Sequence, residues 1–386
     1  MTKLLKPGVY FMEGNIACAE AALIAGCRFY VGYPITPSSE IMHHMARRMP
    51  EVGGVFIQME DEIGSIMAAL GASAAGVKSM TATSGPGLSL MQESIGLAAM
   101  LELPVVIVDV QRAGPSTGIP TLMGQGDVMQ CRWGSHGDYE VVAYLPSNPQ
   151  EFFDMTIEAF NIAEQLRIPA FVLADKVVGQ MYGKVRVPDY SEVKITERTK
   201  PDIPPDKFRE FLPYDSKYLV PPFAAAGDGY RIHMTGLMHD ERGYPNLTKE
   251  ASWKLVTRLV RKVRENAKKI AKWDEINVDD SKIIVIAYGS VSGSAKKAIK
   301  IAREKGIKVG LFRPRIVWPF PTWRIEELDS KNYIDTFVVV EVNMGQIYHI
   351  VKGYVKNAKV IHISHAPGYL PEPEYILSQI EKIYKR

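Results

Sequence analysis

Short apolar segments alternate with segments of helical periodicity through the first half of the chain. Each apolar run predicts a strand, and the stretch after it places apolar residues three and four apart, as an amphipathic helix does. This alternation predicts an α/β fold with a parallel sheet. The expected strands are residues 28–32, 55–59, 78–83, 104–110 and 169–174, and the expected helices include residues 14–25, 61–75 and 149–166.

The same alternation resumes near residue 282 and predicts a second α/β unit. Its expected strands are residues 283–288, 308–312, 337–342 and 360–364, and its last helix is residues 372–384. Residues 187–237 are rich in proline and charge and have no clear period, which predicts an extended connector. Because 386 residues are too many for one small core, we divide the chain into residues 1–186, a connector at 187–250, and residues 251–386.

Residues 251–273 predict a strongly basic helix at the start of the second unit. Eight cations on it are accompanied by a single acid, Glu265. A solvated outer face is the favoured interpretation, and a docking face for an acidic partner is the alternative. The cations are Lys254, Arg258, Arg261, Lys262, Arg264, Lys268, Lys269 and Lys272.

Charge and hydropathy exclude several classes of protein. A net charge of +3 gives no sign of nucleic-acid binding, for which a strongly basic domain is expected. The N-terminal region contains Glu13 and Glu20 and has no secretory cleavage signal. The longest apolar run, near residues 95–110, is interrupted by Glu102 and Pro104 and is too short to span a bilayer. We therefore expect a cytoplasmic protein with no membrane segment.

The three cysteines, Cys18, Cys27 and Cys131, are scattered along the chain. None forms a C-x-x-C pair, and three isolated thiols cannot supply the four thiolates of an iron–sulfur cluster. A structural zinc site is equally unsupported. We interpret the cysteines as small buried thiols, so any electron-transfer metal would belong to another chain.

Arg112 occupies the most informative position in the sequence. It follows the expected strand at residues 104–110, and ligands of open α/β sheets bind just beyond the carboxyl ends of the strands. An arginine there can bind a carboxylate through two parallel N–H bonds. Gly114, Gly118 and the nearby prolines favour a loop after it. A structural ion pair beside an ordinary connection is the alternative.

Two further strand-to-helix junctions carry candidate ligand groups. The first holds three successive acids, Glu60, Asp61 and Glu62; helix capping explains one or two of them but does not need three. A carboxylate here could act as a fixed hydrogen-bonding partner for a ring nitrogen of a ligand. The second is the turn at residues 83–87, Thr-Ser-Gly-Pro-Gly, whose backbone N–H groups can approach a ligand. A plain turn explains it equally well.

Thr36 and Pro37 follow the expected strand at residues 28–32. Threonine is a preferred N-cap residue, and proline suits the first turn of a helix. We therefore expect a helix that begins at Pro37 and has Thr36 as its N-cap.

Taken together, and in the order in which they occur along the chain, these motifs resemble those of the alpha subunit of 2-oxoacid:ferredoxin oxidoreductases. The 2-oxoglutarate branch is the most similar. The resemblance covers nearly the whole chain and includes a C-terminal unit similar to the transketolase C-terminal domain. The loop Gly-Pro-Ser-Thr-Gly-Ile-Pro-Thr after Arg112 resembles the 2-oxoglutarate type, whereas pyruvate and branched-chain relatives usually differ there. The matching segments are Gly14-Asn15, residues 33–39, 60–64, 81–87 and 112–121, Gly126-Asp127, and His136-Gly137-Asp138.

The resemblance implies a thiamin diphosphate enzyme in which residues 1–186 form the pyrimidine-binding domain. Glu62 matches the glutamate that bonds the aminopyrimidine ring nitrogen and so favours the imino form, although spacing alone does not separate it from Glu60 and Asp61. The turn residues Ser84, Gly85 and Pro86 would contact the cofactor. Gly227-Asp228-Gly229 resembles the start of the magnesium–diphosphate motif, but a proline-rich stretch precedes it and Asn246 follows too soon, so we interpret it as a turn.

For the substrate, the resemblance implies that Thr36 and Arg112 contact the 2-oxoacid end. Ser116, Thr117 and Thr121 would line the pocket around the longer side chain. The implied reaction is the coenzyme A-dependent oxidative decarboxylation of 2-oxoglutarate to succinyl-CoA and CO2 with reduction of ferredoxin. A beta subunit would hold Mg2+ and the diphosphate, and gamma and ferredoxin-like delta subunits would complete an assembly whose partner chains carry the [4Fe-4S] clusters.

Three alternatives remain open. The same chemistry could act on pyruvate or on branched-chain 2-oxoacids. The chain could belong to a thiamin-dependent transferase or decarboxylase without electron transfer. It could also be a non-catalytic anion-binding subunit with the α/β sheet as its scaffold.

Overall fold

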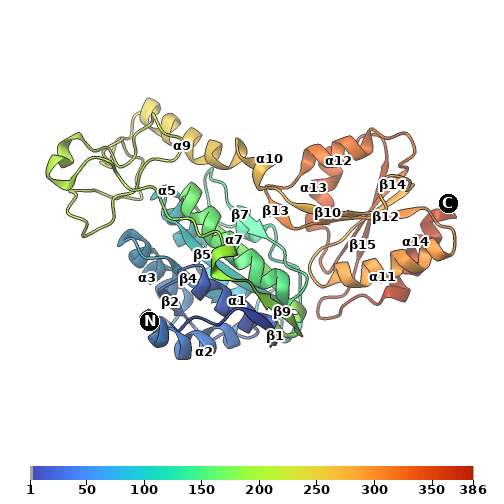
Figure 1. Ribbon diagram of the computed structural model, residues 1–386. Helices are drawn as coiled ribbons and strands as arrows, with labels where there is room; N and C mark the ends of the chain where they lie inside the picture. Colours follow the sequence, from blue (N-terminus) through green and yellow to red (C-terminus); the bar gives the residue numbers. More distant parts are fainter. Residues whose placement is uncertain (1–2, 386) are drawn as a thin grey trace.

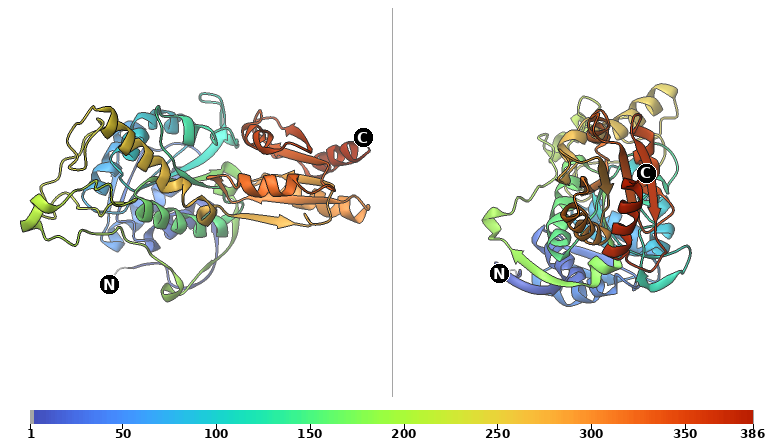
Figure 2. Two further views of the ribbon diagram at one scale, coloured as in Figure 1. Left: turned by 90° about the horizontal axis from the view of Figure 1, so that it is seen from above. Right: turned by 90° about the vertical axis from the view of Figure 1, so that its right-hand side faces the viewer.

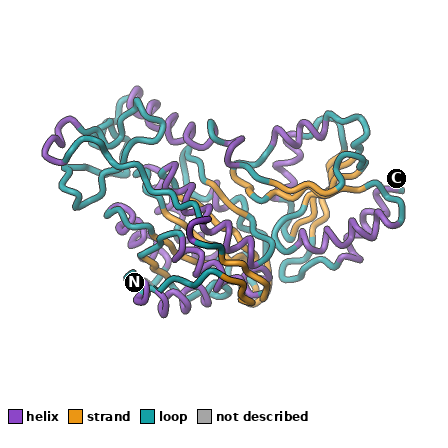
Figure 3. Tube along the Cα trace, in the orientation of Figure 1, coloured by secondary structure: helices purple, strands orange, loops and turns teal. Residues whose placement is uncertain are grey.

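Two α/β lobes joined by a long connector make up the computed structural model, which describes residues 3–385 (Figure 1). The N-terminal lobe, blue to green, contains the larger sheet, and the C-terminal lobe, orange to red, the smaller one. Strands lie at the centre of each lobe with helices outside them (Figure 3). The larger sheet has the order β13 (Ile316–Trp318), β7 (Val142–Tyr144), β8 (Pro169–Asp175), β5 (Val105–Ala113), β4 (Ser79–Thr83), β2 (Phe29–Gly32), β3 (Val55–Gln58).

The central strands of this sheet are buried on both faces. Every residue of β4, β5 and β8 is buried, as expected for parallel strands covered by helices on two sides. One face packs on α1 (Gly14–Ile24), α2 (Ser39–Arg48) and α7 (Pro149–Leu166). The other packs on α3 (Glu62–Ala74), α4 (Gly85–Leu90) and α5 (Gln92–Met100). The short elements α6 (Gln130–Trp133) and α8 (Lys176–Gln180) follow strand ends.

The C-terminal lobe is built on a five-stranded sheet, seen from two further sides in Figure 2. Its strand order is β10 (Trp273–Ile276), β12 (Val309–Pro314), β11 (Ile283–Ile286), β14 (Thr336–Glu341), β15 (Lys359–Ser364). One face packs on α11 (Val291–Glu304) and α14 (Pro373–Tyr384), and the other on α12 (Thr322–Asp329) and α13 (Gln346–Tyr354). After β12 the chain crosses back, and β13 pairs with β7 at the edge of the larger sheet.

The predicted α/β class and the parallel sheet are confirmed, and all nine expected strands form within a few residues of their expected bounds. The short strands β7, β10 and β13 were missed, as was β6 (Ile119–Met123), which pairs with β5. The antiparallel pair β1 (Gly8–Glu13) and β9 (Tyr182–Val187) was also missed. These segments pair with partners distant in sequence or are too short to show a period of two.

The connector between Val187 and Lys249 has no α-helix or β-strand among its described residues, only the 3-10 turns η2 (Tyr190–Glu192) and η3 (Pro205–Glu210). Arg167, at the end of α7, anchors the connector to the N-terminal lobe. Its guanidinium is buried and donates to the carbonyl of Pro221 at 2.9 Å and to that of Glu102 at 3.1 Å. A proline-rich segment offers carbonyls without competing N–H groups, so one arginine can hold it. Nowhere in residues 3–385 is there a helix with both the length and the apolar character to cross a membrane.

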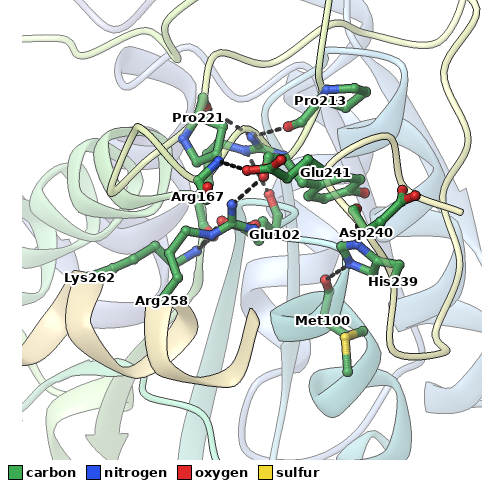
Figure 4. Close-up of polar contacts among 12 residues, drawn as sticks. Met100, Glu102, Arg167, Pro213, Pro221, His239, Asp240, Glu241, Arg258 and Lys262 are labelled. Carbon is green, nitrogen blue, oxygen red and sulfur yellow. Dashed lines mark hydrogen bonds and ion pairs between the residues drawn. The ribbon is translucent and has the colours of Figure 1, made fainter. Parts of the chain in front are cut away.

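The basic helix is held by a buried acid (Figure 4). It forms as α9 (Lys249–Arg264) and α10 (Ala267–Ile270), and the predicted helical end at residue 273 is wrong because β10 begins there. Lys262 donates to the fully buried Glu102 carboxylate at 2.9 Å, and Arg258 pairs with its other oxygen. Burial alone would raise the pKa of Glu102, but the charges of Lys262 and Arg258 outweigh it and lower that pKa to about 2.

The interpretation of this helix as a solvated outer face is therefore wrong for Arg258 and Lys262. The alternative of a docking face for an acidic partner is also weakened, since four acids of the chain itself pair with the helix. Those acids are Glu102, Glu140, Glu241 and Glu265. Glu102, which pairs with two of the cations, lies about 160 residues away in the sequence. The pattern of the helix alone therefore could not reveal this contact.

We expect Glu102→Gln to destabilise the protein by about 3–5 kcal/mol, because it leaves two buried cations without their counter-charge. Glu265→Gln is the matched control, since its ion pair with Arg261 is exposed and such pairs contribute little. Chemical denaturation of both variants measures the difference. Equal midpoints for the two variants would contradict the role given to the buried cluster.

Candidate functional site

A cleft of about 440 Å3 opens at the carboxyl edge of the larger sheet, where the two lobes meet. The N-terminal lobe contributes the start of α4, the end of β5 and two loops, and the C-terminal lobe contributes the loop after β14. Its walls include Gly85, Pro86, Ser89, Arg112, Gly114, Pro115, Ser116, residues 124–127, Gln130, residues 342–344, Gln346 and Pro367. This is the edge at which the sequence predicted a ligand.

Arg112 is the cation of the cleft. It lies at the end of β5 and is only 8% exposed. Its Nη1 donates to the carbonyl of Thr36 at 2.8 Å, while its buried Nε has no hydrogen-bond partner in the described chain. Burial lowers the pKa of Arg112, and the carboxylates of Asp127 and Glu62 oppose that shift, so the guanidinium stays charged. Arg112 therefore places a charged guanidinium in the wall of the cleft.

The turn that carries Thr36 is fixed from two sides. Besides the bond from Arg112, the side chain of buried Asn15 donates to the carbonyl of Pro37 at 2.9 Å. The expected N-cap role of Thr36 is wrong, because α2 begins at Ser39 and Ser38 precedes it. The Ser38 hydroxyl donates to the carbonyl of Ile35, which closes a separate turn before the helix. This turn places the Thr36 carbonyl against Arg112, although Thr36 is not among the residues that line the cleft.

The three acids before α3 have different environments. Glu60 is exposed. Asp61 is the N-cap of α3 and accepts a hydrogen bond from the N–H of Gly64 at 2.8 Å. Glu62 is the first helical residue and is 4% exposed. Capping thus explains Asp61, and burial separates Glu62 from the other two, which spacing alone could not do.

The Glu62 carboxylate lies over a glycine. A Cβ on Gly87 would collide with the Glu62 carboxylate and with the Thr83 hydroxyl. Burial raises the pKa of Glu62, and the charge of Asp61 adds to the shift, while Arg112 opposes it. A buried carboxyl of raised pKa is suited to hold a proton toward a ring nitrogen. The residues at this position therefore fit an aminopyrimidine ring.

We expect Gly87→Ala to reduce turnover by at least about tenfold, because the new methyl group must displace the Glu62 carboxylate or Thr83 and a small misplacement of a reacting group has a large effect. Gly71→Ala, in the middle of α3, is the control, since a Cβ there meets no atom within 4 Å. Steady-state assays of the assembled enzyme compare the two. Normal turnover in Gly87→Ala would show that the position of Glu62 does not matter.

The remaining predicted site residues divide into two groups. Gly85, Pro86 and Ser116 line the cleft, and Ser84 lies buried just before α4 with its hydroxyl unpartnered. Thr117 and Thr121 are exposed and lie outside the lining. The segment folds back as β6 against the end of β5, so its successive side chains point to opposite sides. Only part of the loop therefore faces the cleft.

Several groups at the cleft were not found from the sequence. Gln125 is fully buried and joins the lobes: it donates to the carbonyl of Tyr288 at 3.1 Å and accepts from the N–H of Val342 at 3.1 Å. Asp127 lines the cleft, and Asp109 is buried near Arg112. Gly126-Asp127 is one of the matching segments, but the hydrogen-bond partners of Gln125 lie more than 150 residues away in the sequence.

Two other interpretations are confirmed. Cys18, Cys27 and Cys131 are buried and free, and burial raises the pKa of Cys18 and of Cys27 to about 12. Gly227 and Gly229 have φ of +97° and +90°, values that glycine adopts readily, and they flank a turn as expected. Across residues 3–385, no group of three or more His, Cys, Asp or Glu side chains has the arrangement of a metal site.

Comparison with known proteins decides the family. Residues 20–258 match the family described as pyruvate flavodoxin/ferredoxin oxidoreductase, thiamine diphosphate-binding, and residues 281–376 match pyruvate:ferredoxin oxidoreductase core domain II. The chain belongs to this oxidoreductase family. Family membership makes it the alpha-type chain of a thiamin diphosphate-dependent 2-oxoacid:ferredoxin oxidoreductase.

The relatives of this oxidoreductase chain agree with the assignment. It is 53% identical to the 2-oxoglutarate synthase subunit KorA of Methanocaldococcus jannaschii, over 95% of this chain and 97% of that one. It is 38% identical to the ketoisovalerate oxidoreductase subunit VorB of Methanothermobacter marburgensis, over 96% and 97%.

Two solved structures share the fold of the oxidoreductase chain. The 2-oxoglutarate:ferredoxin oxidoreductase of Magnetococcus marinus, solved with 2-oxoglutarate, coenzyme A and succinyl-CoA, superposes with a TM-score of 0.90 at 32% identity. The match covers 97% of this chain and 65% of that one. A split-gene transketolase matches with a TM-score of 0.55 at 13% identity, which confirms the transketolase-like architecture alone.

Proposed function

We propose that this chain is the alpha subunit of a 2-oxoglutarate:ferredoxin oxidoreductase, which converts 2-oxoglutarate and coenzyme A to succinyl-CoA and CO2 and reduces ferredoxin. One observation carries the proposal: a charged arginine, Arg112, lines a cleft at the sheet edge, and the buried carboxyl of Glu62 lies near it. The 53% identity to a 2-oxoglutarate synthase subunit supports this substrate over other 2-oxoacids.

Within this reaction, Arg112 would bind the carboxylate next to the 2-oxo group with its guanidinium at the cleft wall. Thr36 lies on the turn bonded to Arg112 and would contact the same end of the substrate. Ser116 is placed to contact the longer side chain. When bound, thiamin diphosphate supplies the nucleophile and the electron sink for decarboxylation. Glu62 would hold a proton at its carboxyl, facing the pyrimidine ring nitrogen.

The exposed surface near Glu62 is evidence for contact with a partner subunit. Four apolar side chains on β3 and α3, the two elements that flank residues 59–61, are between 37% and 49% exposed. They are Val55, Ile57, Ile63 and Met67. Such a patch marks a protein–protein contact. We infer that a beta subunit covers it and supplies Mg2+ and the diphosphate site.

We also infer that the [4Fe-4S] clusters belong to partner subunits, including a gamma and a ferredoxin-like delta chain. The three thiols of this chain are buried, and the raised pKa of each disfavours the thiolate that iron requires. The use of ferredoxin and coenzyme A fits a cytoplasmic enzyme, which stays our expectation.

The test is to purify the complex and measure coenzyme A-dependent reduction of a viologen with 2-oxoglutarate, pyruvate and 2-oxoisovalerate. We expect 2-oxoglutarate to have the highest kcat/KM. Preference for 2-oxoisovalerate would assign the chain to the branched-chain type. A complex that releases CO2 from the 2-oxoacid without reducing the viologen would exclude the electron-transfer step.

A further inference from the structure

Two carboxyl groups lie beside Arg112 at the cleft. Asp109, on β5, is fully buried, and no N–H or hydroxyl group of the described chain donates to either of its carboxyl oxygens. Asp127 lines the cleft, and its buried Oδ2 likewise accepts no hydrogen bond from an N–H or hydroxyl group of the described chain. The Asp127 carboxyl covers the start of α4, since a Cβ on Gly85 would lie 3.0 Å from that oxygen. Neither group has a role in the chemistry assigned above.

A buried pair of carboxyl groups cannot carry two negative charges at neutral pH. Burial and the nearby Asp127 carboxyl raise the pKa of Asp109 well above its usual range, so Asp109 holds a proton and can donate it to its neighbour. Burial also raises the pKa of Asp127 to about 6, although the hydrogen bond from Asp109 and the charge of Arg112 oppose the shift. The pair therefore carries one negative charge at pH 7.

The other charged and titratable groups around the pair are few. Arg112 is the cation that faces both carboxyls. Cys131, on α6, is a buried thiol whose pKa burial raises, with a further contribution from both carboxyls, so it stays neutral. The charge of Glu62 also acts on Arg112 and raises its pKa. The single negative charge of the pair thus compensates the guanidinium while the cleft holds no anion.

We propose that Asp109 and Asp127 share one proton in the free enzyme and take up a second when a 2-oxoacid carboxylate binds Arg112. This inference rests on the proposed function, because it takes a 2-oxoacid as the ligand of the cleft. The second proton comes from solvent and binds an oxygen of the Asp127 carboxylate. Its arrival removes the charge that competes with the substrate for Arg112. Asp127 is thus a positioning residue that acts through Arg112.

The sign of the pH dependence follows. An anion bound at Arg112 raises the pKa of Asp127 further, so ligand affinity is constant below about pH 6 and falls as the pH rises from there to the pKa of the bound state. We expect the dissociation constant to increase roughly three- to tenfold between about pH 6 and pH 7.5. An arginine alone would give no such dependence in this range.

The test is calorimetric titration of the assembled enzyme with glutarate, a five-carbon diacid that lacks the 2-oxo group and cannot be decarboxylated. Titrations at about pH 7 in buffers of different ionisation enthalpy give the number of protons bound with the ligand. We expect roughly half a proton or more per cleft for the wild type. This readout does not depend on turnover.

Three variants assign the proton. Asp127→Asn should abolish the uptake, since Asp109 is protonated in both states. Asp109→Asn should retain it, because asparagine imitates the neutral acid. Asp228→Asn, in an exposed turn, is the matched control and should behave as the wild type does. Where Asp127→Asn does not assemble, the wild type and Asp109→Asn still give a decision.

Glutarate binding without proton uptake would overturn this inference and leave the proposed function intact. Uptake that persists in Asp127→Asn, or disappears in Asp109→Asn, would also overturn it. Proton uptake as described, in a complex that oxidises none of the three 2-oxoacids, would support the linked proton and reject the proposed function.

Discussion

Glu62→Gln lowers kcat by about 10²- to 10⁴-fold in the assembled enzyme, with little change in KM for the 2-oxoacid. This is the expected loss when a carboxyl that controls a proton is replaced by an amide of the same shape. Glutamine fills the space over Gly87, so packing is kept, but it cannot hold the proton. A fall in kcat without a rise in KM separates this role from substrate binding.

The control for this result is Glu60→Gln. Glu60 lies two residues away and is exposed, so we expect turnover within about twofold of the wild type, as for most surface changes. Retention of thiamin diphosphate by both purified complexes shows that assembly is intact. Normal turnover in Glu62→Gln would instead support the view of this chain as a non-catalytic binding subunit.

Arg112→Met lowers kcat/KM for 2-oxoglutarate by about 30- to 1,000-fold, which corresponds to about 2–4 kcal/mol, with a raised KM. The substitution removes the cation that faces the cleft and leaves the bound carboxylate unpaired. It also removes the counter-charge of Asp127, so ligand binding should lose its dependence on pH. Initial-rate kinetics at several pH values measures both effects.

Arg261→Met is the matched control, because that arginine is exposed on α9 and forms an exposed ion pair with Glu265. It should leave kcat/KM unchanged. If Arg112→Met keeps the wild-type kcat/KM, the carboxylate of the substrate binds elsewhere, and the assignment of the cleft fails with it.

The sequence predicts most of the fold because its main signal is local. The buried strands β5 and β8 each contain a continuous apolar run, and the helices around them have a clear period. The short strand β13 has no such signal, since it exists only by pairing with β7 of the other lobe. The predicted end of the basic helix was wrong for a similar reason, because Trp273 begins an edge strand that pairs with β12.

The site shows the same division between local and distant information. Arg112 and Glu62 could be proposed from the sequence because one stands at a strand end and the other at a helix start, where ligand sites concentrate. The N-cap expectation for Thr36 was wrong, since its turn is held by Asn15 and Arg112 rather than by the helix, and its contact with substrate stays a prediction. The protonation of Asp109 depends on burial and on Asp127, neither of which spacing reveals.

One measurement tests the central claim most directly, namely that this chain provides the pyrimidine half of a shared thiamin diphosphate site. It is the distance between the Glu62 carboxylate and the ring nitrogen of the pyrimidine in a structure of the assembled enzyme with its cofactor. We predict about 2.6–3.2 Å, a hydrogen bond. A pyrimidine ring far from Glu62, bound by another chain or another part of this one, would contradict the account.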